Sequence, residues 1–274
     1  MSFRHFAVRS GVFALAAGLL ATPVTLSAQL AEFPGRHLYE RFGVEAIELF
    51  DLRGQFSGST LVDVRPAAEF DVMRMRDAHH VNLHAPDFDE RVRDLEAREG
   101  SPLVFYCNGR DSHRAYRAAA RASDAGLDAV LAYDAGMNDW ARSYPRFSRL
   151  FGEAVEDDDL IPDASFEARL LDGETFARRA QEDDSLLLDI SGAGDEDDIA
   201  LFGGRERVMP VNEPAALDDA LRAAAADGDT LLIFDQHGQQ VRWLQYRLRE
   251  LGIEDERYYF LEGGMEAFYD EVMG

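Results

Sequence analysis

The single cysteine of this 274-residue chain, Cys107, follows an apolar run over 103–106 and precedes a short polar loop that contains a glycine. A helix is expected to begin near His113 and Arg114. In open α/β sheets ligands bind beyond the carboxyl ends of the strands, and a loop that folds back into a helix directs backbone N–H groups to one point. We expect these groups, the helix dipole and the cations Arg110 and Arg114 to lower the thiol pKa. A lone cysteine is more often buried and inert, whereas a low-pKa thiolate attacks electrophilic sulfur.

The residues after the cysteine form the candidate binding loop. Their backbone N–H groups, guanidinium groups and hydroxyl could hold a small anion. They are Asn108, Gly109, Arg110, Asp111, Ser112, His113 and Arg114. Ser112 could cap the following helix or hydrogen-bond the sulfur. Arg114 could equally be a solvated residue on the surface of that helix.

Three landmarks of the sequence occur twice in the same order. They are an apolar run ending in Asp, an apolar run before a Gly-bearing loop, and a Gly-Met turn: Asp63, Cys107 and Gly136, then Asp189, Asp235 and Gly264. The first and second landmarks lie 44 and 46 positions apart in the two sets, and the second and third lie 29 apart in both. A duplicated unit of roughly 110–120 residues explains this agreement.

Within each unit, short apolar segments alternate with amphipathic segments of helical spacing, such as 115–125 and 241–251. Strands that are apolar on both faces and separated by helices predict an α/β fold with a mainly parallel sheet flanked by helices. We therefore predict two tandem domains, 38–150 and 165–274, joined by an acidic linker over 151–164.

The first 28 residues have the pattern of a secretory signal peptide. Arg4 and Arg9 precede an apolar stretch over 12–21, which is about half the length needed to cross a bilayer. The Leu-Ser-Ala sequence at 26–28 fits a cleavage site before Gln29. We predict a periplasmic or secreted protein without membrane contact after cleavage; the alternative is an uncleaved N-terminal anchor.

The net charge is −24, and it becomes −26 without residues 1–28, which hold two Arg and no acidic residue. This charge argues against nucleic acid and anionic membranes as partners. All 28 basic residues are Arg, which suggests a salt-adapted source or a GC-rich genome.

One cysteine excludes a disulfide framework and an all-cysteine metal site. The pair His79 and His80 lacks a third ligand at a telling spacing, so we predict neither a metal nor a cofactor.

The order and spacing of these motifs resemble those of the tandem rhodaneses, a family of sulfurtransferases with two rhodanese-like domains. In the first unit the resemblance rests on Val62 to Pro66 with Glu69 and Phe70, on Phe105 to Cys107 with its loop, and on Ala135 to Met137 with Trp140. In the second unit it rests on Leu188 to Ile190, on Asp235 to Gly238, and on Leu261 to Met265 with Phe268. It covers nearly the whole chain from about residue 40.

The resemblance implies that Cys107 is a nucleophile that takes a sulfane sulfur from a small anionic donor such as thiosulfate. The resulting persulfide would pass the sulfur to cyanide or a thiol, or to a protein acceptor. The family often has Gly three residues and Arg five residues after the cysteine, whereas Arg110 and Ser112 stand there in this chain. This departure puts the shape of the loop and the preferred donor in question.

The resemblance also assigns two groups of acidic residues. Asp63 and Glu69 with Arg65 correspond to an ion pair within the domain, so we expect them to be structural. Asp235 takes the place of the nucleophile in the second domain. A carboxylate cannot carry a persulfide, so we expect this domain to be catalytically silent.

We therefore predict an exported sulfurtransferase that carries sulfur on Cys107. One alternative is a non-catalytic sulfur-relay or protein-docking module. Another is a phosphatase or arsenate reductase, because some cell-cycle phosphatases use the same fold. Those enzymes need an Arg six residues after the nucleophile, where this chain has His113, with Arg114 one position later.

Overall fold

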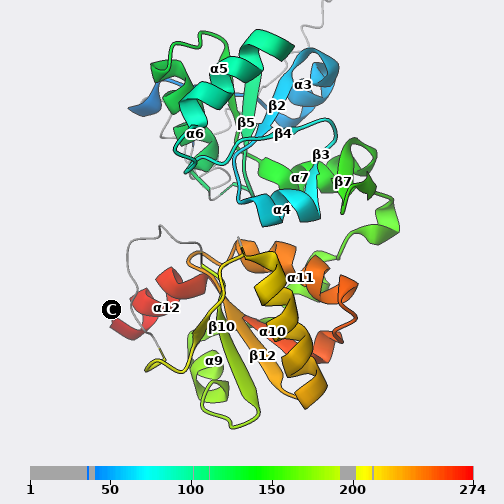
Figure 1. Cartoon of the computed structure of the whole chain (residues 1–274), viewed down its shortest axis with the longest axis vertical. Helices are drawn as coiled ribbons and strands as arrows, with labels where there is room; N and C mark the ends of the chain where they lie inside the picture. Colours follow the sequence, from blue (N-terminus) through cyan, green and yellow to red (C-terminus); the bar gives the residue numbers. More distant parts are fainter. Residues whose placement is uncertain are drawn as a thin grey trace, which may run out of the picture.

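The computed structural model describes Arg36 and residues 41–100, 102–110, 112–191, 202–211 and 213–273. The predicted signal segment, 1–28, lies outside the described residues. No helix in the described ranges is long and apolar enough to cross a membrane. Figure 1 shows two parallel sheets in separate halves of the molecule, with α4 (Ala67–Val72) and α11 (Gln240–Glu250) facing each other between them.

The first sheet has the strand order β1-β6-β5-β2-β4, and all its strand pairs are parallel. Its strands are β1 (Glu45–Ala46), β2 (Thr60–Asp63), β4 (His79–His80), β5 (Leu103–Tyr106) and β6 (Val130–Tyr133). The helices of this half, besides α4, are α3 (Leu49–Gly54), α5 (Phe88–Glu99), α6 (Arg114–Asp124) and α7 (Gly136–Ser143).

The second sheet has the order β11-β10-β12-β13-β9, again with parallel pairs. Its strands are β9 (Leu170–Leu171), β10 (Ser185–Asp189), β11 (Arg207–Val208), β12 (Thr230–Phe234) and β13 (Tyr258–Leu261). The helices of this half, besides α11, are α8 (Asp163–Glu167), α9 (Gly173–Arg179), α10 (Pro214–Asp227) and α12 (Gly264–Met273). When the strands of each sheet are numbered in chain order, the two sheets have the same strand order, from the edge strand β1 in the first sheet and from the edge strand β9 in the second.

A small antiparallel sheet lies beside the first one. It consists of β3 (Met73–Met75), β7 (Ser148–Leu150) and β8 (Glu153–Ala154). Short 3-10 helices connect the larger elements: η2 (Phe56–Gly58), η3 (Pro145–Phe147), η4 (Asp157–Asp159) and η5 (Asp255–Arg257). The predicted linker, 151–164, therefore contains β8, η4 and the beginning of α8.

The central strands are mainly apolar because they are buried on both faces, although β2 and β10 each end in Asp. Along β5, Leu103 and Phe105 pack with α5 and α6, whereas Val104 and Tyr106 pack with α3 and α7. Side chains alternate along a strand, so Cys107, the next residue, points to the α5 and α6 face. The predicted α/β fold with parallel sheets flanked by helices is confirmed, while the predicted domain boundaries remain a prediction.

Candidate active site

The loop after β5 is held by the start of α7. The Met137 N–H donates to the Cys107 carbonyl at 2.9 Å, and the Asn138 N–H donates to the Asn108 carbonyl at 3.2 Å. Gly136 has a φ of 73°, and a Cβ there would lie 2.4 Å from the Gly109 nitrogen. The Gly-Met turn thus brings the two backbones together at a distance that only glycine permits.

The thiol of Cys107 is fully buried, and it donates to the Ser112 carbonyl with a sulfur-to-oxygen distance of 3.8 Å. Burial raises the pKa of this thiol. The Ser112 hydroxyl, the Ala115 and Gly109 N–H groups and the charge of Arg114 act in the opposite direction but do not outweigh burial. The prediction of a lowered pKa is therefore wrong, because the predicted anion-favouring groups surround a sulfur that is desolvated.

The other predicted loop residues differ in their burial and in their contacts. Ser112 is buried, and its Oγ accepts from the Arg114 N–H at 3.4 Å, but the N-cap of α6 is His113, without a side-chain cap hydrogen bond, so the possible capping by Ser112 is not seen. Arg110 turns away to Asp139, with 2.6 Å between Nη2 and the carboxylate. His113 precedes α6 and is exposed, and Arg114 is the half-buried first residue of that helix. Asp111 lies outside the described residues.

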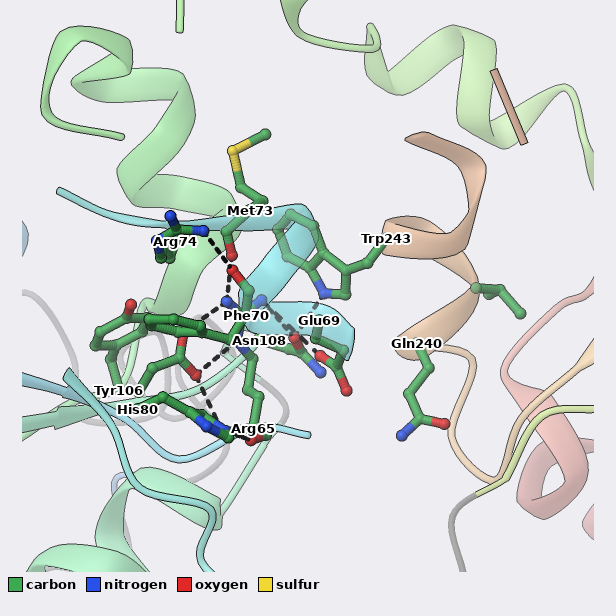
Figure 2. Close-up of polar contacts among 12 residues, drawn as sticks. Arg65, Glu69, Phe70, Met73, Arg74, His80, Tyr106, Asn108, Gln240 and Trp243 are labelled. Atoms are coloured by element: carbon green, nitrogen blue, oxygen red, sulfur yellow. Dashed lines mark hydrogen bonds and ion pairs between the residues drawn. The ribbon is translucent and has the colours of Figure 1, made fainter. Parts of the chain in front are cut away.

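Asn108 joins the loop to the second half of the molecule. Its Oδ1 accepts from Trp243 Nε1 at 2.5 Å and from Arg65 Nη1 at 3.3 Å. Trp243 belongs to α11 but packs into the core beside α7 and β3. The indole therefore covers the residue next to the cysteine, and Figure 2 shows it reaching across from α11.

A pocket of about 270 Å³ lies over the loop and is shared by both halves. The first half contributes Gly109, Arg110 and Asn138, and the second contributes Gly238, Gln239 and Arg242. Arg242 donates to Asn138 Oδ1 at 2.7 Å and to Asp163 at 2.6 Å.

Sequence reasoning missed Trp243 and Arg242 as parts of this site. A weak signal for them exists. Both lie in the helix after the Asp235 loop, the counterpart of α6, which begins at the Cys107 loop.

The loop after β12 repeats the backbone contacts of the loop after β5. The Met265 N–H donates to the Asp235 carbonyl at 2.9 Å, and Gly264 has a φ of 71°. The Asp235 carboxylate, 2% exposed, accepts the N–H groups of four residues that close the loop: His237 at 2.8 Å, Gln239 at 3.2 Å, Gln240 at 2.7 Å and Val241 at 2.9 Å. This carboxylate fills the centre of its own loop.

The Asp63 and Arg65 side chains form a fully buried pair at the end of β2. Arg65 donates to both carboxylate oxygens, at 2.9 and 2.6 Å, and also to the Met73 carbonyl at 2.5 Å. Figure 2 shows Arg65 between Tyr106, Asn108 and Trp243. The geometry agrees with the expected structural role, and the bond to Asn108 extends that role to the Cys107 loop.

The two adjacent histidines lie on β4. The His80 ring nitrogen Nε2 is 2.8 Å from the Arg65 carbonyl oxygen. Within the described ranges, no three His, Cys, Asp or Glu side chains are grouped so that they could hold a metal ion.

No curated protein matches. A Bacillus halodurans protein of known structure is 20% identical over 48% of this chain and 94% of its own, with a TM-score of 0.35. The human single-domain sulfurtransferase is 19% identical over 35% of this chain and 95% of its own, with a TM-score of 0.30. The thiosulfate sulfurtransferase from Pseudomonas aeruginosa is 18% identical over 87% of this chain and 42% of its own, with a TM-score of 0.33.

The family comparison is more specific. The model of the rhodanese-like domain matches residues 45–143, which include the Cys107 loop and the Gly136 turn. The match ends before the second sheet begins, so it does not extend to the predicted second domain. The chain thus contains one rhodanese-like domain, residues 45–143, and that domain carries its only cysteine.

Proposed function

We propose that this protein is a sulfurtransferase that carries a sulfane sulfur as a persulfide on Cys107. The observation that supports the proposal is the environment of Sγ at the end of β5. The Gly109 and Ala115 N–H groups, the Ser112 hydroxyl and Arg114 all favour negative charge on this atom, although burial outweighs them while the thiol is unmodified. A persulfide anion carries its charge one atom further from Cβ, and a loop of N–H groups suits it.

The transfer consists of two displacements. After its proton leaves to solvent, the thiolate attacks the outer sulfur of thiosulfate. The S–S bond of the donor breaks and sulfite leaves with its electron pair. An acceptor such as cyanide or a thiol then attacks the outer sulfur of the persulfide, which releases product and restores the thiolate.

The donor reaches the loop through the pocket that Arg110 and Arg242 line. Both guanidinium groups already have carboxylate partners, Asp139 and Asp163. They therefore offer a weak, exchangeable site for an anion rather than a tight one. Cys107 is fully buried, and the neighbouring Asn108 is held by Trp243, so we expect sulfur uptake to require movement of the loop.

Mass spectrometry of the protein after incubation with thiosulfate tests the proposal. We expect a gain of one sulfur atom that is lost on later incubation with cyanide. Cys107→Ser should show no gain, and thiosulfate should leave the fold of both proteins unchanged by circular dichroism. The absence of a gain in a folded protein whose thiol still reacts with an alkylating agent would contradict the proposal.

A sulfur-relay or docking module is the second candidate, and the raised thiol pKa under the indole of Trp243 favours it. In that case a partner protein, rather than a small anion, would deliver or receive the sulfur. Persulfide transfer from a protein donor under conditions in which thiosulfate gives none would support this candidate.

We further propose that the chain is exported and that the half around Asp235 is a silent second rhodanese-like domain. The signal-like sequence of residues 1–28 supports export. The identical strand order and the matching Gly136 and Gly264 contacts support a duplication. N-terminal sequencing of the protein from the periplasm or medium of the producing cell tests export with cleavage, since absence of the protein from these fractions would contradict export and a chain that begins at Met1 would contradict cleavage.

A further inference from the structure

Trp243 also lines a second cavity, which lies between α4 of the first half and α10 and α11 of the second. Its volume is about 300 Å³. Much of its wall is apolar, with Val72 on one side and Leu217 and Leu244 on the other. A cavity of this size with a largely apolar wall can hold a small organic molecule.

One polar group in the wall stands out because the described chain satisfies it only weakly. Glu69 is 2% exposed, and neither carboxylate oxygen has a hydrogen bond of ordinary geometry among the described residues, although the Asn108 side chain lies beside it. Its nearest ion-pair partner, Arg65, is 3.9 Å away and is already bound to Asp63. Figure 2 shows Glu69 and Gln240 extending from opposite halves towards the space between them.

A buried carboxylate without hydrogen bonds is costly in free energy, since water no longer solvates it. Burial accordingly raises the pKa of Glu69, although the charges of Arg65 and Arg114 and the side chain of Asn108 oppose this effect. A ligand with a charged donor group would remove the cost that the fold leaves in place.

The remaining charges of the wall decide the sign of the ligand. Besides Glu69, the titratable groups that line the cavity are Asp71, Asp218 and Arg247. Arg247 donates from Nε to Asp218 at 2.9 Å, so those two charges offset each other. Arg65 beside Glu69 is already paired with Asp63, and Arg114 lies outside the wall, so the buried Glu69 and the exposed Asp71 leave the lining negative within a chain whose net charge is −24. An anion is therefore disfavoured there.

We propose that this cavity binds a small organic cation with an apolar body. Its ammonium group pairs with Glu69, and its body lies against Trp243, Leu217 and Leu244. The proposal does not depend on sulfur transfer at Cys107.

Isothermal titration calorimetry of the full chain with matched probes tests the proposal. The probes are methylammonium, butylammonium and benzylammonium, with benzoate as the anion of similar size to benzylammonium. We expect saturable binding of butylammonium or benzylammonium, about tenfold weaker binding of methylammonium, and none of benzoate. The absence of saturable binding by all three ammonium ions would overturn the proposal, as would equal binding of benzoate.

Two variants locate the site. Glu69→Gln keeps the shape and removes the charge, so the ammonium affinity should fall about tenfold or more. Leu217→Trp fills the cavity from the opposite wall and should abolish binding while Glu69 is retained. Glu174→Gln, at an exposed position on α9, changes the net charge equally and should leave the affinity unchanged. Unchanged affinity in Leu217→Trp would overturn the proposal even if Glu69→Gln failed to fold.

Discussion

The loop after β5 and the loop after β12 share a backbone arrangement and differ in what fills it. A glycine with positive φ presses against each loop, and the next residue donates its N–H to the first loop carbonyl. In the second loop the Asp235 carboxylate takes four N–H groups. In the first loop a neutral, buried thiol stands at this point. The second loop therefore contains its own anion, whereas the first gains one only when its sulfur ionises or is modified.

The two loops also differ in how far residues of other elements bury them. Asn108 of the first loop is buried under Trp243 of the other half. In the second loop, His237 is exposed, and its Nδ1 lies 2.8 Å from the carboxylate of Glu266 on α12. Access to the cysteine loop thus depends on how the halves pack, whereas the Asp235 loop contributes Gly238 and Gln239 to the shared pocket and leaves His237 exposed.

The largest expected effect is that of adding a methyl group to either glycine. In Gly136→Ala and Gly264→Ala the Cβ would lie 2.4 Å from loop backbone atoms at positive φ. We expect each change to lower the free energy of unfolding by about 2–5 kcal/mol in urea titrations. Sulfur uptake should be lost in Gly136→Ala and retained in the folded fraction of Gly264→Ala.

Gly252→Ala is the matched control, because Gly252 has a φ of 73° but open space around the added Cβ. Its cost should be about 1–2 kcal/mol, from backbone strain alone. If Gly136→Ala cost no more than this control, the close approach of loop and turn would not be rigid.

Removal of the built-in anion should have a smaller effect. Asp235→Asn replaces charge-assisted hydrogen bonds with neutral ones and presents only one acceptor oxygen, so we expect a loss of about 1–3 kcal/mol. Thermal or urea unfolding measures this loss. Asp172→Asn is the control, since Asp172 accepts the Thr175 N–H as an exposed helix cap and Asn caps equally well. Equal effects of the two changes would show that the buried loop does not need the charge.

Trp243→Phe should have the smallest effect on stability, about 1 kcal/mol, because it removes one hydrogen bond, to Asn108. Alkylation of Cys107 by iodoacetamide should become faster, since the loop loses a restraint. Because burial raises the thiol pKa, the alkylation rate of both proteins should rise about tenfold for each pH unit between 7 and 9. A rate that levelled off below pH 8 would contradict the raised pKa. Trp140→Phe, at a core position whose indole donates to the Phe147 carbonyl, is the control.

Most of the fold follows from patterns that local physics dictates. The apolar run before Cys107 is β5, and the helical spacing over 115–125 and 241–251 corresponds to α6 and α11 within one residue at their beginnings and ends. Burial on both faces imposes such patterns residue by residue. The strand β8 was not predicted, because its residues, Glu153 and Ala154, are exposed and show no apolar alternation.

The site was harder to predict, because its properties depend on contacts between distant segments. The position of Cys107 at a strand end was visible in the sequence, but its depth of burial, which sets the pKa, was not. Trp243 lies 135 positions after Asn108, and its apolar character is equally typical of a core residue. The burial of Glu69 without a close hydrogen bond likewise depends on contacts between segments that are distant in the sequence, such as α4 and α11.

The hydrogen bond between Asn108 and Trp243 also couples two equilibria: ligand binding or persulfide formation at the Cys107 loop, and the association of the two halves. If persulfide formation or ligand entry displaces Asn108 from the indole, it weakens the association of the two halves by the same factor by which that association had opposed entry. Loading the cysteine with sulfur would then loosen the molecule at α11, and a partner that recognises the loosened form would select the sulfur-loaded protein over the empty one.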